Sequence, residues 1–197
     1  VPDASALENH LSGYSLGKGY EEIIPASADM LAHLRESVLP GMHGPMEQVC
    51  STPKTSEWQF HLPAAARFSV SKIAGVFREH GDSDYADSLE LLGSDALEGF
   101  LQGFIDKIAA HNNAYGVIDW KTNKLAAYDP ESLRKAARAS HYWLQTHLYL
   151  GDQADIRGAW LVYLRGVQSG TPNSILHINP ARGLLKGLGE LFISPKP

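Results

Sequence analysis

Two stretches decide the fold that this sequence predicts: Gly103-Phe104-Ile105-Asp106-Lys107-Ile108 and Gly116-Val117-Ile118-Asp119-Trp120-Lys121. Each is a short, mostly apolar run of strand length that carries an aspartate. The polar residues His111-Asn112-Asn113-Ala114 separate them and predict a turn, so a hairpin would bring Asp106 and Asp119 side by side. Two neighbouring carboxylates repel each other unless a cation joins them. The hairpin therefore predicts a cation site.

The second stretch also supplies a lysine to the same place. Asp119 and Lys121 are two residues apart, so on a strand their side chains lie on one face, while Trp120 lies on the other. We expect the lysine to lie beside the cation. The plain alternative is that these hairpin charges form a surface salt bridge.

Composition sets the limits for a function. The chain has 197 residues, enough for one folded unit, and its 44% hydrophobic and 20% charged residues are typical of a soluble globular protein. No apolar run approaches the length that crosses a bilayer. The single Cys50 excludes an internal disulfide and a four-cysteine zinc or iron-sulfur site, and it fits a cytoplasmic protein.

The charge and the start of the chain add two expectations. A net charge of −5 argues against a generally basic, DNA-coating protein, although carboxylates that hold a metal count as negative in this total. The sequence opens Val1-Pro2-Asp3 without a methionine or a signal segment, so we expect a piece of a longer polypeptide. It contains no phosphate-binding Gly-x-x-x-x-Gly-Lys-Ser/Thr loop.

The order of predicted elements is that of an α/β fold. Residues 1–56 are predicted as a helical lead-in, and residues 57–197 as the core. The expected elements are a helix at Ala28–Val38, a strand at Glu57–Leu62, a loop at Gly81–Asp84, the hairpin, a strand at Trp160–Leu164 and a helix at Pro180–Phe192; the segments Phe68–Glu79 and Ser88–Leu92 are ambiguous.

One long helix is predicted after the hairpin. Asp129-Pro130-Glu131 is typical of a capped helix start, and the pattern continues to about Gly151. At 100° per residue, one stripe of this helix carries five polar side chains: Arg134, Arg138, His141, Gln145 and Tyr149. The position of the helix after Asp119 and Lys121 suggests that this stripe faces the site, with the two arginines contacting phosphates; the alternative is a solvated helix face.

Five segments together resemble, in order and spacing, the RecB family of nuclease domains. They are Glu57-Trp58-Gln59-Phe60-His61-Leu62-Pro63, Gly103-Phe104-Ile105-Asp106, Ile118-Asp119-Trp120-Lys121-Thr122-Asn123, Gln145-Thr146-His147-Leu148-Tyr149 and Tyr163-Leu164-Arg165-Gly166-Val167. The resemblance covers about residues 20 to 193. It implies a restriction-endonuclease-like, PD-(D/E)XK fold, with a mixed central sheet flanked by helices, that cleaves DNA phosphodiesters with Mg²⁺.

The resemblance also implies roles for individual residues. Asp106 and Asp119 match the metal-binding acids of the family, and the main-chain carbonyl of Trp120 matches a further ligand. Lys121 matches the catalytic lysine. Gln145 and Tyr149 match the Gln-x-x-x-Tyr motif of the RecB-like branch, and Glu57 matches an acidic residue near the metal. Mn²⁺ and Ca²⁺ are alternative occupants of such a site.

The resemblance further implies partners and leaves one alternative open. The expected partners are DNA, a helicase region of the same polypeptide and RecC-like and RecD-like subunits, acting together in double-strand-break repair and recombination. One histidine of the family, carried by an upstream helix, has no counterpart here, because His10 lacks the surrounding motif. The second interpretation is therefore a catalytically incomplete nuclease fold that binds DNA or sister subunits.

Overall fold

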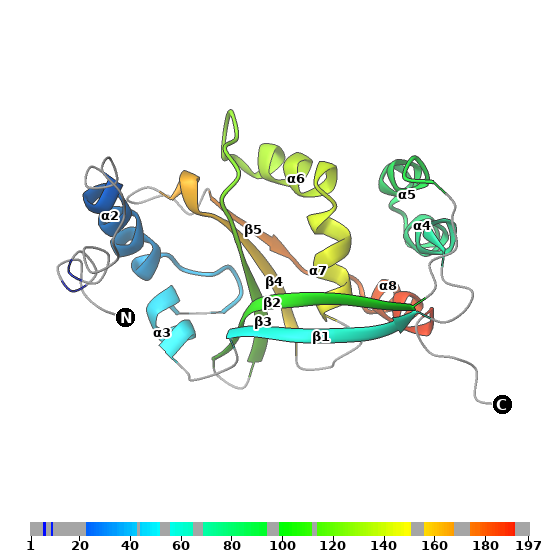
Figure 1. The fold of residues 1–197 in the computed structure, drawn as a ribbon, viewed down its shortest axis with the longest axis horizontal. Coiled ribbons are helices and arrows are strands. Elements are labelled where there is room, and N and C mark those ends of the chain that lie inside the picture. Colours follow the sequence, from blue (N-terminus) through cyan, green and yellow to red (C-terminus); the bar gives the residue numbers. More distant parts are fainter. Residues whose placement is uncertain are drawn as a thin grey trace.

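The computed structural model shows a mixed α/β fold built on one five-stranded sheet (Figure 1). It describes residues 6, 9, 23–42, 44–51, 56–64, 69–93, 99–111, 114–150, 156–167 and 174–191. The strands follow one another across the sheet in chain order: β1 (Ser56–Ala64), β2 (Gly99–His111), β3 (Ala114–Lys121), β4 (Ile156–Tyr163) and β5 (Ile175–Ile178). Neighbouring strands are antiparallel except β3 and β4, which are parallel.

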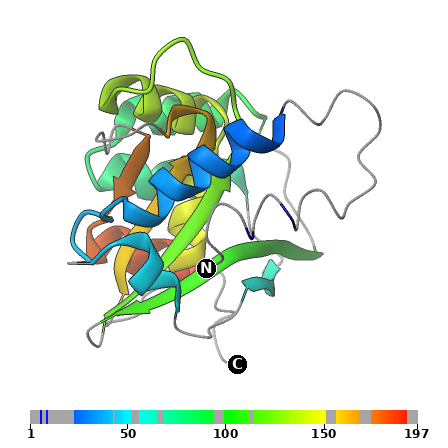
Figure 2. The same cartoon turned by 90° about the vertical axis from the view of Figure 1, so that its left-hand side faces the viewer.

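Helices cover both faces of this sheet. Within the described ranges they are α2 (Ile23–Glu36), α3 (Met46–Ser51), α4 (Val70–Glu79), α5 (Ser83–Glu90), α6 (Pro130–Ala139), α7 (Tyr142–Leu150) and α8 (Arg182–Glu190), with a short 3-10 helix at Leu164–Gly166. Figure 2 shows α2 and α3 on the near side of the sheet, and Figure 1 shows α6, α7 and α8 on the other side. The predicted α/β class is confirmed, and no helix in the described ranges is long and apolar enough to span a membrane.

The predicted hairpin of the two aspartate-bearing strands is present. Strands β2 and β3 pair antiparallel, with Lys107 opposite Ile118 and His111 opposite Ala114. A parallel neighbour, β4, places Trp160 beside β3, and the ring of Trp160 lies where a side chain at Gly116 would be. This close approach explains why the strand carries a glycine at that position.

The side chains of β3 alternate between two separate packing layers. Ile118 packs against Leu34 and Val49 of the helices α2 and α3, and Trp120 lies at the edge of that cluster. On the opposite face, Val117 packs against Leu150 of α7. Because alternate residues of a strand lie on opposite faces, Asp119 and Lys121 lie on the α7 face, as the spacing predicts.

The predicted long helix from Pro130 to about Gly151 is wrong, because the structure has two helices there. Helix α6 ends at Ala139 and α7 begins at Tyr142, and His141 between them has a left-handed backbone with φ of 56°. The chain changes direction at this point (Figure 1). A left-handed residue cannot continue a right-handed helix, so the expected single stripe is divided into two.

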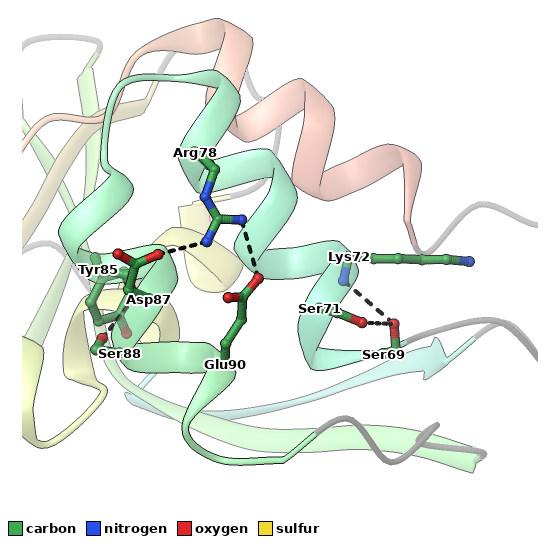
Figure 3. A network of polar contacts seen from close by, with 8 residues as sticks. All are labelled: Ser69, Ser71, Lys72, Arg78, Tyr85, Asp87, Ser88 and Glu90. Atoms are coloured by element: carbon green, nitrogen blue, oxygen red, sulfur yellow. Dashed lines mark hydrogen bonds and ion pairs between the residues drawn. The ribbon is translucent and has the colours of Figure 1, made fainter.

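The segment Gly81–Asp84, predicted as a loop, is only partly one. Helix α5 begins at Ser83, so Ser83 and Asp84 form its first turn. The pair α4 and α5 is joined by Arg78 of α4, which binds Asp87 at 2.7 Å and Glu90 at 3.1 Å on α5 (Figure 3). Of the ambiguous segments on either side of the turn, residues 70–79 and 88–90 are helical.

The remaining elements agree with expectation in kind. Helix α2, strand β1, strand β4 and helix α8 lie where a helix, two strands and a helix are predicted, with shifted ends. Strand β5 has no predicted counterpart. It pairs with β4 through Ile175 and Ile178, both buried. The division of the chain into residues 1–56 and 57–197 stays a prediction.

Candidate functional site

The two aspartates of the hairpin lie where β2 and β3 separate. Lys107 and Ile118 form the last pair of the β2–β3 ladder, and Asp106 comes one residue beyond it. Its carboxylate oxygen Oδ2 accepts the main-chain N–H of Trp120 at 2.8 Å. The Asp106 side chain thus bridges the two strands and lies next to Asp119, whose pKa it raises.

Asp119 and Lys121 form a buried pair on β3. Their side chains are 6% and 8% exposed, and Lys121 Nζ lies 2.5 Å from Asp119 Oδ2. Burial raises the pKa of Asp119 to about 6; the Lys121 ammonium opposes this rise, and Asp106 adds to it. The Oδ2 atom makes no hydrogen bond of good geometry with any described residue. This oxygen contacts the Lys121 ammonium and could also bind a metal cation.

The Lys121 ammonium is held from the helix side by α7. Gln145 Oε1 accepts a hydrogen bond from Lys121 Nζ at 3.3 Å. The amide nitrogen of Gln145 donates to the Tyr149 hydroxyl, which donates to the main-chain oxygen of Phe104 at 2.8 Å. Burial, together with the nearby Asp119 charge, raises the pKa of Tyr149 to about 12. The two motif residues therefore connect the lysine to β2, two residues before Asp106.

The donor set suits a hard divalent cation. Proteins hold magnesium through one or two carboxylates and leave several waters on the ion, so Asp106 and Asp119 could supply the protein oxygens for such a site. The described residues contain no group of three or more histidine, cysteine, aspartate or glutamate side chains placed to hold a metal. A main-chain oxygen, the role predicted for Trp120, would be one source of a further protein ligand.

Glu57 lies on β1, on the opposite side of Asp106 from Asp119. It is exposed, and it occupies the position on β1 between the Ser56–Lys107 and Trp58–Ile105 pairs. Its backbone has a left-handed φ of 53°. An open cleft of about 450 Å³ is lined by Cys50, Ser56, Glu57, Asp106, Lys107 and Trp120. Glu57 and Asp106 therefore line the same cleft, next to the place where the carboxylates of Asp106 and Asp119 meet.

The two arginines predicted to contact phosphates lie on α6. Arg138 makes a two-pronged ion pair with Asp82, at 2.5 and 3.1 Å, and its guanidinium lies over the ring of Tyr85. Arg134 is exposed, with its guanidinium 5.9 Å from the ring of Trp143. The structure thus places Arg138 in a contact between α6 and the turn before α5, and leaves Arg134 open to solvent.

Tyr142 is a site residue that the sequence analysis did not find. Its ring centroid lies 3.7 Å from Lys121 Nζ, and its hydroxyl donates to Asn123 Oδ1 at 3.3 Å. Once α7 begins at Tyr142, residues 142, 145 and 149 share one helix face. The spacing Tyr-x-x-Gln-x-x-x-Tyr is the available signal, because residues i, i+3 and i+7 share a face of any α-helix.

Fold and site define an α/β domain with two carboxylates and a buried lysine at the point where a central hairpin opens. Its sequence is similar to one region of RecB, a subunit of the RecBCD enzyme. It is 28% identical to the protein of Haemophilus influenzae over 154 residues, 69% of this chain and 12% of the relative. The protein of Escherichia coli K12 is 27% identical over 167 residues, 75% of this chain and 14% of the relative.

A third relative extends the same pattern. RecB of Buchnera aphidicola is 21% identical over 155 residues, which are 69% of this chain and 13% of that protein. No protein-family profile matches the chain. The chain thus spans 12–14% of the length of these curated relatives and is similar to only that part of them.

Proposed function

We propose that this chain is a Mg²⁺-dependent deoxyribonuclease domain with a restriction-endonuclease-like, PD-(D/E)XK fold. The observation that carries the proposal is the carboxylate pair. Asp119 is buried with one oxygen lacking a well-formed hydrogen bond, Asp106 lies beside it on the neighbouring strand, and Lys121 shares its face. A buried carboxylate beside a second one costs folding energy that the Lys121 ammonium offsets only in part, and a bound divalent cation would offset it further.

Each residue has a task in this proposal. Asp106 and Asp119 would hold the cation, with the main-chain carbonyl of Trp120 as a further oxygen ligand. A bound ion would supply an activated water and neutralise charge on the phosphate. Lys121 stabilises negative charge on the reacting phosphate or positions the nucleophile. Gln145 and Tyr149 hold Lys121, and Glu57 lies in the neighbouring cleft as an auxiliary acid.

The similarity to RecB supports DNA as the substrate. We propose that this domain acts in a RecBCD-type helicase-nuclease in the cytoplasm, on single strands delivered by a helicase region, during double-strand-break repair and recombination. RecC-like and RecD-like subunits are the proposed partners. Arg134 is open to solvent and is available for a phosphate contact. Arg138 is engaged by Asp82, which leaves fewer of its donors for such a contact.

A second candidate function follows from the small number of side-chain ligands. The described residues offer no cluster of three metal-binding side chains, and Asp119 is already paired with Lys121. A nuclease fold with an incomplete metal site would bind DNA or sister subunits without cleaving DNA.

The experiment that separates the two is degradation of linear single-stranded DNA with Mg²⁺ or Mn²⁺. The purified chain is compared with Asp119→Ala and Lys121→Ala, and the matched controls are Asp84→Ala and Lys135→Ala, which change exposed residues of the same types. We expect the two site variants to lose cleavage by about a thousandfold or more and the controls to retain it.

Two outcomes would count against the nuclease assignment. Cleavage retained by a folded Lys121→Ala protein would overturn the proposed site. DNA binding without cleavage in the unaltered chain, with either metal, would favour the second candidate. Circular dichroism of each variant shows whether a loss of cleavage is a loss of the fold.

A further inference from the structure

We propose that Tyr142 is a positioning residue for Lys121, which makes the functional stripe of α7 one turn longer than the Gln145 and Tyr149 pair. The inference rests on the proposed function for its activity readout. Its geometric part concerns only the contact between the Tyr142 ring and the Lys121 ammonium, 3.7 Å apart.

The helix geometry places Tyr142 in this role. Tyr142, Gln145 and Tyr149 lie at positions i, i+3 and i+7 of α7, which are neighbours on one helix face. Helix α7 packs against β3 and β4, so this face lies over the strand that carries Lys121. The left-handed His141 ends the preceding helix and allows Tyr142 to begin the new one at the site.

The contacts of the ammonium show why a third group is needed. A lysine side chain is flexible, and its ammonium has three donors that must all be satisfied when it is buried. Asp119 Oδ2 and Gln145 Oε1 lie at 2.5 and 3.3 Å from Nζ, and the Tyr142 ring faces the same nitrogen. The negative face of an aromatic ring attracts a cation, most strongly where water is excluded.

The contact between the Tyr142 ring and the Lys121 ammonium would matter more if Asp119 also held a metal ion. A carboxylate oxygen shared with a divalent cation attracts the ammonium less strongly than a free one. Gln145 and Tyr142 are then the groups among the described contacts that keep Lys121 in place. The ring, and not the hydroxyl, is therefore the part of Tyr142 that positions Lys121.

The hydroxyl makes a separable contact. It donates to Asn123 Oδ1 at 3.3 Å, and Asn123 follows Lys121 by two residues. Tyr142→Phe removes this contact and keeps the ring. Asn123→Ala removes it from the other side and is the matched control, because Asn123 does not contact the ammonium in any described interaction.

The first test is spectroscopic and needs neither metal nor DNA. A ring over the ammonium shifts the NMR signals of the Lys121 Hε protons upfield. In the full chain without metal, we expect this shift in the unaltered protein, in Tyr142→Phe and in Asn123→Ala, and its loss in Tyr142→Leu. A Lys121 signal that is the same in the unaltered protein and in Tyr142→Leu would overturn the proposal.

The second test measures cleavage of single-stranded DNA with Mg²⁺. We expect Tyr142→Leu to lower kcat about tenfold with little change in KM, because the ring contacts Lys121. Tyr142→Phe should recover most of that loss. Equal losses in Tyr142→Phe and Tyr142→Leu would overturn the assignment to the ring.

The proposal stays testable if the leucine variant does not fold, and also if the chain does not cleave DNA. Tyr142→Met, whose flexible side chain fills irregular space, replaces Tyr142→Leu in both tests should the leucine variant fail to fold. If the unaltered chain does not cleave DNA, the proposed function fails, but the proton shift still decides whether Tyr142 holds Lys121.

Discussion

Helices α6 and α7 follow each other along the chain and carry polar residues in one continuous pattern, yet they serve different parts of the molecule. The polar residues of α7 surround Lys121: Gln145 binds its ammonium, and Tyr142 lies against it. One of the two arginines of α6, Arg138, binds Asp82 in the turn between α4 and α5. One helix contributes to the site, and the other attaches a helical pair to the body of the domain.

The difference shows how a local backbone event changes the use of a sequence pattern. The left-handed His141 ends α6 and redirects the chain, so residues on either side of it no longer lie on one stripe. Uncharged polar side chains and an aromatic ring are directed at the lysine. The charged guanidinium of Arg138 binds the carboxylate of Asp82, which lies 56 positions away in sequence.

The largest expected effect concerns α7. Gln145→Ala removes the side-chain acceptor that α7 offers to Lys121, so we expect kcat for DNA cleavage to fall about a hundredfold while the fold is kept. The measurement is steady-state cleavage of single-stranded DNA with Mg²⁺. Ser140→Ala, an exposed residue in the break between the helices, is the control. Equal rates for Gln145→Ala and Ser140→Ala would contradict the claim that α7, unlike α6, contributes to the site.

The next effect concerns α6. Arg138→Ala leaves the partly buried Asp82 carboxylate without its ion pair, and we expect the free energy of unfolding to fall by about 2 kcal/mol. Urea unfolding measures this, and Arg78→Ala, which breaks the exposed ion pairs between α4 and α5, is expected to have the smaller effect. A double-mutant cycle of Arg138→Ala with Asp82→Ala that shows strict additivity would contradict the account.

A smaller effect tests the carboxylate pair through pH. The folded-state pKa of Asp119 is raised to about 6, so this group stabilises the metal-free fold at low pH, and that contribution is lost as pH rises through about 6. Asp106→Asn removes one cause of the raised pKa and keeps an acceptor for the Trp120 N–H.

We therefore expect Asp106→Asn to stabilise the metal-free protein by about 1 kcal/mol at pH 7.5 and to have no such effect at pH 4. Urea unfolding with a chelator at both pH values measures the difference. Added Mg²⁺ should reverse the order at pH 7.5, because the variant lacks a ligand. A stabilisation that is equal at both pH values would show that charge repulsion is not its cause.

The smallest effect is expected at Arg134. Because this side chain is exposed, Arg134→Ala should change the free energy of unfolding by less than about 0.5 kcal/mol. A phosphate contact would instead appear as a salt slope of DNA binding reduced by about one. Fluorescence anisotropy of labelled single-stranded DNA measures the slope. An unchanged slope, equal to that of the Lys135→Ala control, would exclude Arg134 from the DNA path.

The β2–β3 hairpin could be predicted from the sequence because its causes are local. Alternating apolar residues define the strands, polar residues define the turn, and the two-residue period places Asp119 and Lys121 on one face. The placement of Asp106 beside Asp119 follows from that pairing. The metal and the roles of these residues stay predictions.

Other features depend on contacts that the sequence pattern does not contain. The end of α6 has neither glycine nor proline to mark it, so the periodicity alone predicts a helix that continues past His141. Strand β5 has four residues and is stabilised by pairing with β4. The bond between Arg138 and Asp82 joins distant segments. Tyr142 was missed because its role depends on where α7 begins.

The most direct test of the central claim is a titration of the full chain with Mn²⁺ at pH 7.5, in which electron paramagnetic resonance detects the free ion. The claim is that Asp106 and Asp119 together form a divalent-cation site. It predicts saturable binding by the unaltered chain and the loss of that binding in the folded double variant Asp106→Asn, Asp119→Asn. The same binding curve for both proteins, or no saturable binding by the unaltered chain, would contradict it.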